Sequence, residues 1–186
     1  MNNKIVKLAV VLFAICAIVA GVLGVVNELT KDTIAAYELK KENDALKVVL
    51  PDGDEFAEID SNAYSFTGKK ITVLSVKEAG NGAGYAVKCS FSGAQGTITM
   101  LVGVKEDLTC GGISIISHSE TSGLGANAAS TAEVGVNFRA QFEGVGKDVA
   151  LAKKGGTIDA LTGATITSTS VTNAVSEAIQ VVESIG

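Results

Sequence analysis

An uncharged apolar run near the N-terminus restricts the architecture of this 186-residue chain more than any other feature. Leu8–Val26 holds 19 residues without a charge, about the length that a helix needs to cross the hydrocarbon core of a bilayer. Lys4 and Lys7 precede the run, whereas charges of both signs follow it. The positive-inside rule therefore predicts an uncleaved single-pass anchor with a cytoplasmic N-terminus and an extracytoplasmic remainder. A cleaved signal peptide is the alternative, but no Ala-x-Ala site follows the run.

Helix-forming sequence continues from Asn27 to Leu50 and is stopped by Pro51. This connector forms either one helix or two, and it would span roughly 36 Å if unbroken, at about 1.5 Å per residue. We therefore expect three parts: a transmembrane anchor over residues 1–26, a helical connector over 27–50, and an extracytoplasmic domain over 51–186.

The first half of that domain shows the alternation of apolar and polar residues that is typical of half-buried strands. Strands are predicted at 71–76, 85–91, 98–104 and 112–117, with a hairpin turn at 93–96. Because short turns join them, we expect an antiparallel meander. The expected fold class is α+β: a membrane helix, then an antiparallel sheet with packed helices.

A C-terminal helix is predicted from apolar residues that recur at helical spacing between Val171 and Ile185. A hydroxyl-rich stretch precedes it, and Ser168, Thr169 or Ser170 is expected to cap its first turn. The N-terminus of a helix concentrates free N–H groups and the positive end of the helix dipole, so it suits a phosphate group. Thr165, placed by this prediction just before the helix, presents a hydroxyl there.

Charge and cysteine usage exclude several classes of function. The chain has 15 basic and 20 acidic residues, and two of the basic ones precede the apolar run, which leaves a net charge of −7 on the remainder. A surface of that sign repels nucleic acid phosphates. Cys16, Cys89 and Cys110 show no metal-ligand spacing and His118 is the only histidine, so no metal site is expected. Cys89 and Cys110 either pair in a disulfide or stay buried as thiols.

The residues before the C-terminal helix resemble a known motif. Asp159, Thr162, Gly163, Ala164 and Thr165 are similar to the Asp-x-x-(Ser/Thr)-Gly-Ala-Thr flavinylation motif of FMN-binding domains. Those domains occur in the G subunit of the Rnf complex and the C subunit of the sodium-pumping NADH:quinone oxidoreductase. The resemblance implies covalent FMN, which a separate flavin transferase moves from FAD onto the last threonine of the motif as a phosphoester.

A polar glycine-rich loop upstream extends the resemblance. The family carries His-x-Glu-Thr-Pro-Gly-Leu-Gly, and the matching residues are Glu120, Thr121, Gly123, Leu124 and Gly125. Ser122 replaces the proline, which leaves the loop less rigid. A downstream Phe-x-x-Gln-Phe is matched by Phe138, Gln141 and Phe142.

The resemblance also assigns expected roles. Thr165 would be the attachment residue, and the surrounding phosphate turn would be shaped by Thr162, Gly163, Ala164 and Thr167. Asp159 would orient this turn, or bind the transferase or its magnesium. The loop from Glu120 to Gly125 would line the isoalloxazine ring, with Leu124 packing against it. His118 is expected to face solvent. We expect no catalytic residue, because an electron relay needs no general base.

The function implied is that of an electron-relay subunit, inactive alone, in an Rnf-type membrane complex. That complex would couple electron transfer between ferredoxin and NAD to sodium or proton transport. One alternative is an FMN-carrying subunit of another extracytoplasmic chain, such as the sodium-pumping NADH:quinone oxidoreductase. A second alternative is a pilin-like structural protein, which shares the layout of an apolar helix before a sheet. The chain has neither a Gly-Phe processing site nor a glutamate early in the apolar run.

Overall fold

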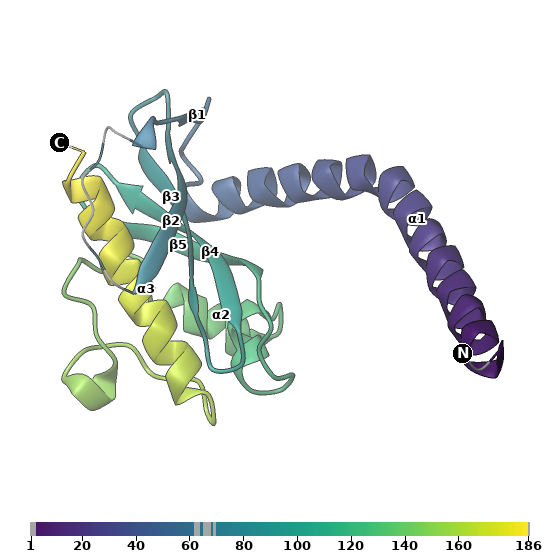
Figure 1. The fold of residues 1–186 in the computed structure, drawn as a ribbon. Helices are drawn as coiled ribbons and strands as arrows, with labels where there is room; N and C mark the ends of the chain where they lie inside the picture. The colour runs from purple at the N-terminus through teal and green to yellow at the C-terminus, as the bar shows by residue number, and fades with distance from the viewer. Residues whose placement is uncertain (1–2, 62–63, 65–67, 69, 186) are drawn as a thin grey trace. The chain divides into compact units, whose positions relative to one another are not determined.

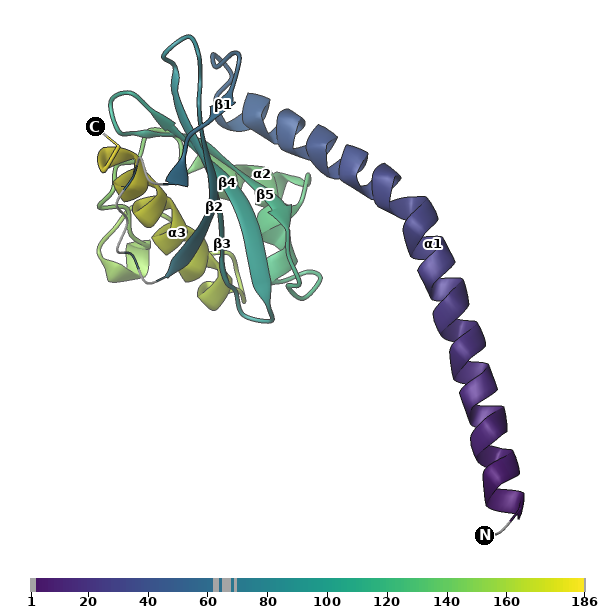
Figure 2. The same cartoon turned by 45° about the horizontal axis from the view of Figure 1, so that its top comes forward.

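The computed structural model describes residues 3–61, 64, 68 and 70–185 of the chain (Figures 1 and 2). In chain order its elements are α1 (Asn3–Val49), β1 (Ala57–Glu58), β2 (Ile71–Glu78), β3 (Gly84–Ser92), β4 (Thr97–Lys105), β5 (Cys110–Ser117), the 3-10 helix η2 (Gly125–Ala129), α2 (Glu133–Ala140), the 3-10 helix η3 (Ala152–Lys154) and α3 (Thr165–Glu183). The chain forms two compact units, Met1–Lys41 and Glu42–Gly186. The second unit therefore begins inside the segment that we predicted as a connector.

The apolar run and the predicted connector form one continuous helix, α1, and not two. Side chains along the run are exposed in this structure, and the helix is long and apolar enough to cross a membrane by length and composition. This finding supports the predicted anchor as a candidate membrane span.

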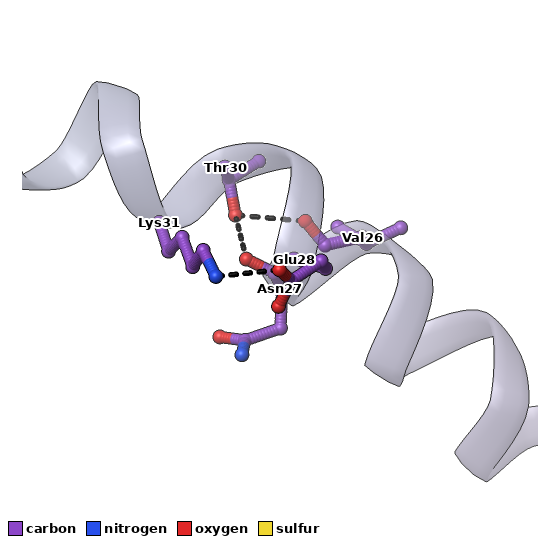
Figure 3. A network of polar contacts seen from close by, with 5 residues as sticks. All are labelled: Val26, Asn27, Glu28, Thr30 and Lys31. Atoms are coloured by element: carbon purple, nitrogen blue, oxygen red, sulfur yellow. Dashed lines mark hydrogen bonds and ion pairs between the residues drawn. The ribbon is translucent and has the colours of Figure 1, made fainter.

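Figure 3 shows the first polar turn of α1 after the apolar run. The hydroxyl of Thr30 donates to the carbonyl oxygens of Val26 (2.9 Å) and Asn27 (3.4 Å). Lys31 donates to Glu28 at 2.5 Å, an exposed pair three residues apart. Such surface pairs contribute only about 0.2–0.5 kcal/mol. The Thr30 hydroxyl and the Lys31 ammonium therefore find their partners within the helix itself.

The second unit is built on an antiparallel sheet, which the described residues form with strands in the order β1-β2-β3-β4-β5. This is the predicted meander, and the predicted hairpin turn at 93–96 joins β3 to β4. The sequence prediction missed β1, because its two residues pair only with Lys77 and Glu78 and are too few to show an alternating pattern. The α+β fold class is confirmed.

The inner face of the sheet carries the main core. Cross-strand pairs such as Val87 with Val102 and Cys89 with Met100 are fully buried there. The apolar face of α3 covers them, and α3 lies along the sheet in both views (Figures 1 and 2). Each fully buried Val, Ile or Met side chain contributes about 1.5–3 kcal/mol. This face therefore fixes the position of α3.

Cys89 and Cys110 are both free thiols within the described part of the chain, which decides between the two predicted alternatives. Both side chains belong to the buried core. Burial disfavours the charged thiolate and raises the pKa of each thiol to about 12. They therefore act as small apolar core residues.

The outer face of the sheet is covered in part by the last turns of α1. A second, smaller cluster of buried residues forms here, made of Ala45, Leu46, Val49, Leu50, Ala86 and Leu101. Glu42 closes this contact because its carboxylate accepts hydrogen bonds from Lys77 of β2 and Lys88 of β3, the second at 2.6 Å. The end of α1 is thus an integral part of the second unit.

Two sheet glycines allow this close packing. A Cβ placed on Gly103 would lie 2.2 Å from the carbonyl oxygen of Val49, and one on Gly111 would lie 2.6 Å from the same atom. Real Cβ atoms do not come so close to a backbone oxygen. Glycine in these strands, which elsewhere weakens a sheet, marks the place where another backbone approaches it.

We expect Gly103→Ala to lower the free energy of unfolding of the second unit by about 1–3 kcal/mol, because the methyl group forces Val49 and the end of α1 away from the sheet. Guanidinium unfolding of the full chain in detergent, followed by circular dichroism, measures this change. Gly146→Ala is the matched control, since a Cβ there meets open space. An equal change in the free energy of unfolding for the two substitutions would show that the close approach of Val49 to Gly103 is not the cause of the loss.

Candidate functional site

The N-terminus of α3 differs from the prediction. The helix begins at Thr165 itself, its N-cap is Ala164, and no described side chain caps it. The predicted cap by Ser168, Thr169 or Ser170 is wrong, because Ser168 is buried in the first turn of the helix. Its hydroxyl accepts from the backbone N–H of Leu161 (3.0 Å) and donates to the carbonyl of Ala164 (2.9 Å). Ser168 therefore fastens the preceding turn to the helix.

Thr165 stands exposed at the start of α3. The turn before it, Thr162 and Gly163, is also exposed, whereas Ala164 is buried and serves as the inward anchor of the segment. Gly163 has a φ of +73°, a left-handed conformation that costs glycine little and most other residues about 1–2 kcal/mol. The glycine of the motif is therefore required by the backbone path that leads into Thr165.

A groove of about 480 Å³ lies beside this turn. Its lining residues are Leu151, Ala152, Lys153, Ile158, Asp159, Ala160, Leu161, Thr162, Gly163 and Thr165. Lys153 and Asp159 bring one positive and one negative side chain to the groove. The predicted attachment residue and most of its motif thus share one hollow of a size that suits a small-molecule ligand.

Gln141 holds the backbone at Asp159 from the side of α2. Its amide oxygen accepts from the N–H of Asp159 at 2.7 Å, and its amide nitrogen donates to the carbonyl of Asp159 at 3.4 Å. Phe138 and Phe142, on either side, are buried with their rings 5.3 Å apart and edge to face. The Phe-x-x-Gln-Phe motif therefore positions the start of the flavinylation motif. Sequence reasoning matched Gln141 but gave it no role.

The loop that follows β5 contacts the same turn. A Cβ on Gly163 would lie 2.9 Å from a methyl carbon of Leu124, so Leu124 lies over the glycine. Leu124 nevertheless keeps 44 % of its surface exposed. It is an accessible apolar side chain beside the turn that leads into Thr165. Thr121 and Gly123 are exposed in the same loop, and Gly125 is buried.

Glu120, predicted to line the ring, and Thr167, predicted to shape the phosphate turn, both lie in the interior. Glu120 is 8 % exposed, and its two oxygens accept from the N–H of Gln95 at 2.9 Å and from the hydroxyl of the fully buried Thr167. Burial opposes the charged form, but these bonds and those from Ala94 and Gly96 outweigh it and hold the pKa of Glu120 below its ordinary value. Neither side chain lines the groove.

Arg139 of α2 secures the far end of the loop. Its guanidinium donates to the carbonyls of Ala128 (2.7 Å) and Ser130 (2.9 Å), at the end of η2. Gly135 permits the close approach of α2, since a Cβ there would lie 2.4 Å from the carbonyl oxygens of Asn127 and Ser130. His118 is exposed as predicted, and its ring nitrogen accepts from the N–H of Glu120 at 3.3 Å.

Comparison with known families identifies the class of protein that carries this arrangement. Residues 93–180 match the FMN-binding domain family, and residues 1–49 match the RnfG N-terminal region. The first match spans both glycine-containing motifs and most of α3. The protein thus contains an FMN-binding domain, and its N-terminal region belongs to a second family model.

Curated relatives make the family specific. The chain is 32% identical over 185 residues to the G subunit of the ion-translocating oxidoreductase complex of Methanosarcina acetivorans, with 97% of this chain and 96% of the relative covered. It is 33% identical to the G subunits of two further complexes, the proton-translocating ferredoxin:NAD(+) oxidoreductase of Clostridium ljungdahlii and the Na(+)-translocating ferredoxin:NAD(+) oxidoreductase of Acetobacterium woodii. Both of these matches cover 96% of this chain and 92% of the relative. The chain belongs to the family of G subunits of ion-translocating oxidoreductase (Rnf) complexes.

The contact between Leu124 and Gly163 can be tested with two alanine substitutions. We expect Gly163→Ala and Gly155→Ala each to lower the free energy of unfolding by about 1–2 kcal/mol, because both glycines have left-handed backbones. Only Gly163→Ala should also move the Leu124 methyl resonances in an NMR spectrum, since a Cβ on Gly155 meets no atom within 4 Å. Unchanged Leu124 resonances in Gly163→Ala would contradict the contact.

The lowered pKa of Glu120 predicts a pH dependence of stability. A carboxyl whose pKa is lower in the folded than in the unfolded state stabilises the fold above the unfolded pKa, which is about 4.5 here, and loses that contribution as the pH falls through the folded value. Urea unfolding from about pH 7 to pH 3 should show wild type more stable than Glu120→Gln near neutral pH, with the gap narrowing below about pH 4.5. A gap independent of pH would contradict this assignment.

Proposed function

We propose that this chain is the electron-relay subunit of an Rnf-type membrane complex and that it carries FMN covalently on Thr165. The complex would couple electron transfer between ferredoxin and NAD to the translocation of sodium ions or protons, the activities for which two of the relatives are named. The observation that carries the proposal is the exposed hydroxyl of Thr165 at the first residue of α3, beside the groove of an FMN-binding domain.

The residues around Thr165 fit a phosphoester. The first N–H groups of a helix have no partners inside it, so a phosphate at Thr165 would lie close to free donors and to the positive end of the α3 dipole. Lys153 in the groove adds a positive charge to a domain whose net charge is negative. A bound flavin supplies one- or two-electron transfer, whereas the protein supplies its position and surroundings.

Attachment requires one substitution at phosphorus. The Thr165 oxygen bonds to the FMN phosphorus of FAD, the pyrophosphate P–O bond breaks, AMP leaves, and the hydroxyl proton passes to a base or to water. A flavin transferase catalyses this step as a maturation partner. The exposed side chains of Asp159 and Thr162 are available for recognition by that enzyme. Thr165 is used once and takes no part in turnover.

Each predicted residue keeps or changes its role in this proposal. The turn formed by Thr162, Gly163 and Ala164 presents the phosphate, and Leu124 packs against the ring, with Thr121 and Gly123 exposed beside it. The buried side chain of Glu120 joins the loop to α3 through its hydrogen bond from Thr167, and Gly125 leaves room for the Glu120 carboxylate. The subunit is not catalytic alone, because its electrons come from and go to other subunits.

We also propose a topology for the chain. Residues 8–26 cross the membrane, Lys4 and Lys7 keep the N-terminus in the cytoplasm, and the flavin domain lies outside. An extracytoplasmic FMN that dissociated would be lost, because no pool of cofactor replaces it there. A covalent link prevents that loss, and this is the advantage of the phosphoester over reversible binding.

The comparisons favour this proposal over both alternatives. The relatives named above are all G subunits, and the match covers nearly the whole chain, including the N-terminal region. A subunit of the sodium-pumping quinone reductase would be expected to match the FMN-binding domain family but not the RnfG N-terminal region. A pilin-like protein has no reason to contain that domain.

Mass spectrometry tests the attachment directly. Protein produced with a flavin transferase and FAD should gain the mass of one FMN less one water, localised to the peptide that contains Thr165. Thr165→Ala should abolish the gain and the flavin-dependent electron transfer of the assembled complex. Thr169→Ala, which removes a hydroxyl one turn further along α3, should retain both. An unmodified wild-type Thr165 under these conditions would refute covalent attachment.

A further inference from the structure

The Glu120 carboxylate joins three segments that are distant in sequence. It lies in the loop after β5, accepts from Gln95 in the turn between β3 and β4, and accepts from Thr167 in the first turn of α3. Two glycines, Gly93 and Gly125, face this carboxylate, and the space leaves no room for a larger side chain at either position. A Cβ on Gly93 or Gly125 would lie 2.4 Å or 2.3 Å from one of its oxygens.

The same loop meets the segment that leads into α3 at a second place, four residues away on each segment. Leu124 contacts Gly163, just as Glu120 bonds to Thr167. Two contacts with the same spacing fix both the position and the direction of one segment against the other. Thr165 lies midway between the two fixed points, exposed between the buried side chains of Ala164 and Thr167.

We propose that the Glu120–Thr167 pair is a positioning device for flavin attachment, which fixes the Thr165 hydroxyl in the place where it accepts the flavin. This inference rests on the proposed function, and it adds residues that act on the reaction without touching the flavin. An oxygen that attacks phosphorus has to lie in line with the departing pyrophosphate oxygen. A misplacement of about 1 Å lowers the rate of such a step by up to about 100-fold.

The pair should affect the rate of transfer more than recognition by the transferase. Neither Asp159 nor Thr162 depends on this hydrogen bond, since Gln141 binds the backbone of Asp159, and Thr162 lies in the turn that the left-handed Gly163 shapes. Loss of the Thr167 hydroxyl leaves these exposed groups in place and frees the first turn of α3. We therefore expect a lower kcat for flavin transfer at nearly constant KM for the apoprotein.

Three substitutions separate positioning from general stability. Thr167→Val keeps the shape of the side chain but removes the hydrogen bond to Glu120, and Thr167→Ser restores a hydroxyl. Thr172→Val is the matched control, because Thr172 is also buried on α3 and its hydroxyl donates to the carbonyl of Ser168 within the same helix at 2.8 Å. Initial rates of FMN incorporation from FAD are followed by intact mass with the full-length apoprotein.

The expected result is a loss of about 10- to 100-fold in kcat for Thr167→Val, recovery to within about threefold for Thr167→Ser, and no change for Thr172→Val. A folded Thr167→Val protein that takes flavin at the wild-type rate would overturn the proposal. So would an equal loss in Thr172→Val, which would indicate a general effect of buried hydroxyls on α3.

Amide hydrogen exchange on the flavin-free protein gives a second test that does not require attachment. Thr167→Val should accelerate exchange at Gln95 and Ala126, whose N–H groups bond to Glu120 and to Thr121, whereas Thr172→Val should not. Unchanged exchange at both amides would overturn the positioning role. If the two variants show the expected exchange but the wild-type protein gains no flavin, the proposed function fails, whereas the structural role of the Glu120–Thr167 hydrogen bond stands.

Discussion

The packing of α3 against the inner face of the sheet is the interaction on which the rest of the structure depends. It buries a continuous apolar face of the helix between strands whose facing side chains are themselves almost fully enclosed. That burial sets which way the first turn of α3 faces, with Thr165 outward and Thr167 and Ser168 inward. The body of α3 is held by the core, and hydrogen bonds of Thr167 and Ser168 hold its first turn beside the groove.

Close backbone approaches complete the site, and glycines make them possible. Gly163 lets Leu124 lie over the turn, Gly125 and Gly93 leave room for Glu120, and Gly135 admits α2. Together these contacts gather three sequence motifs around one exposed hydroxyl. The family to which the chain belongs accounts for the flavin, and the packing accounts for why Thr165, and not Thr167 or Ser168, is presented to solvent in the first turn of α3.

Much of this architecture follows from local patterns, and the parts that do not are tertiary. Alternation located the main strands, and motif matches located the stretch around Thr165. Sequence could not show that Ser168 lies inside α3, because its partner Leu161 is chosen by the fold. It also could not show that Glu120 faces inward or that Gln141 holds Asp159, since long-range hydrogen bonds leave no periodic pattern.

The junction between α1 and the sheet bears on how a water-soluble flavin domain can be obtained. A fragment that begins at Pro51 would lack the last turns of the helix and would expose Ala86 and Leu101, the sheet half of the smaller core. It would also leave Lys77 and Lys88 without their shared carboxylate. A fragment that begins between residues 27 and 41 removes the apolar run and keeps the whole second unit. The natural place to cut this protein therefore lies within a helix and not at its end.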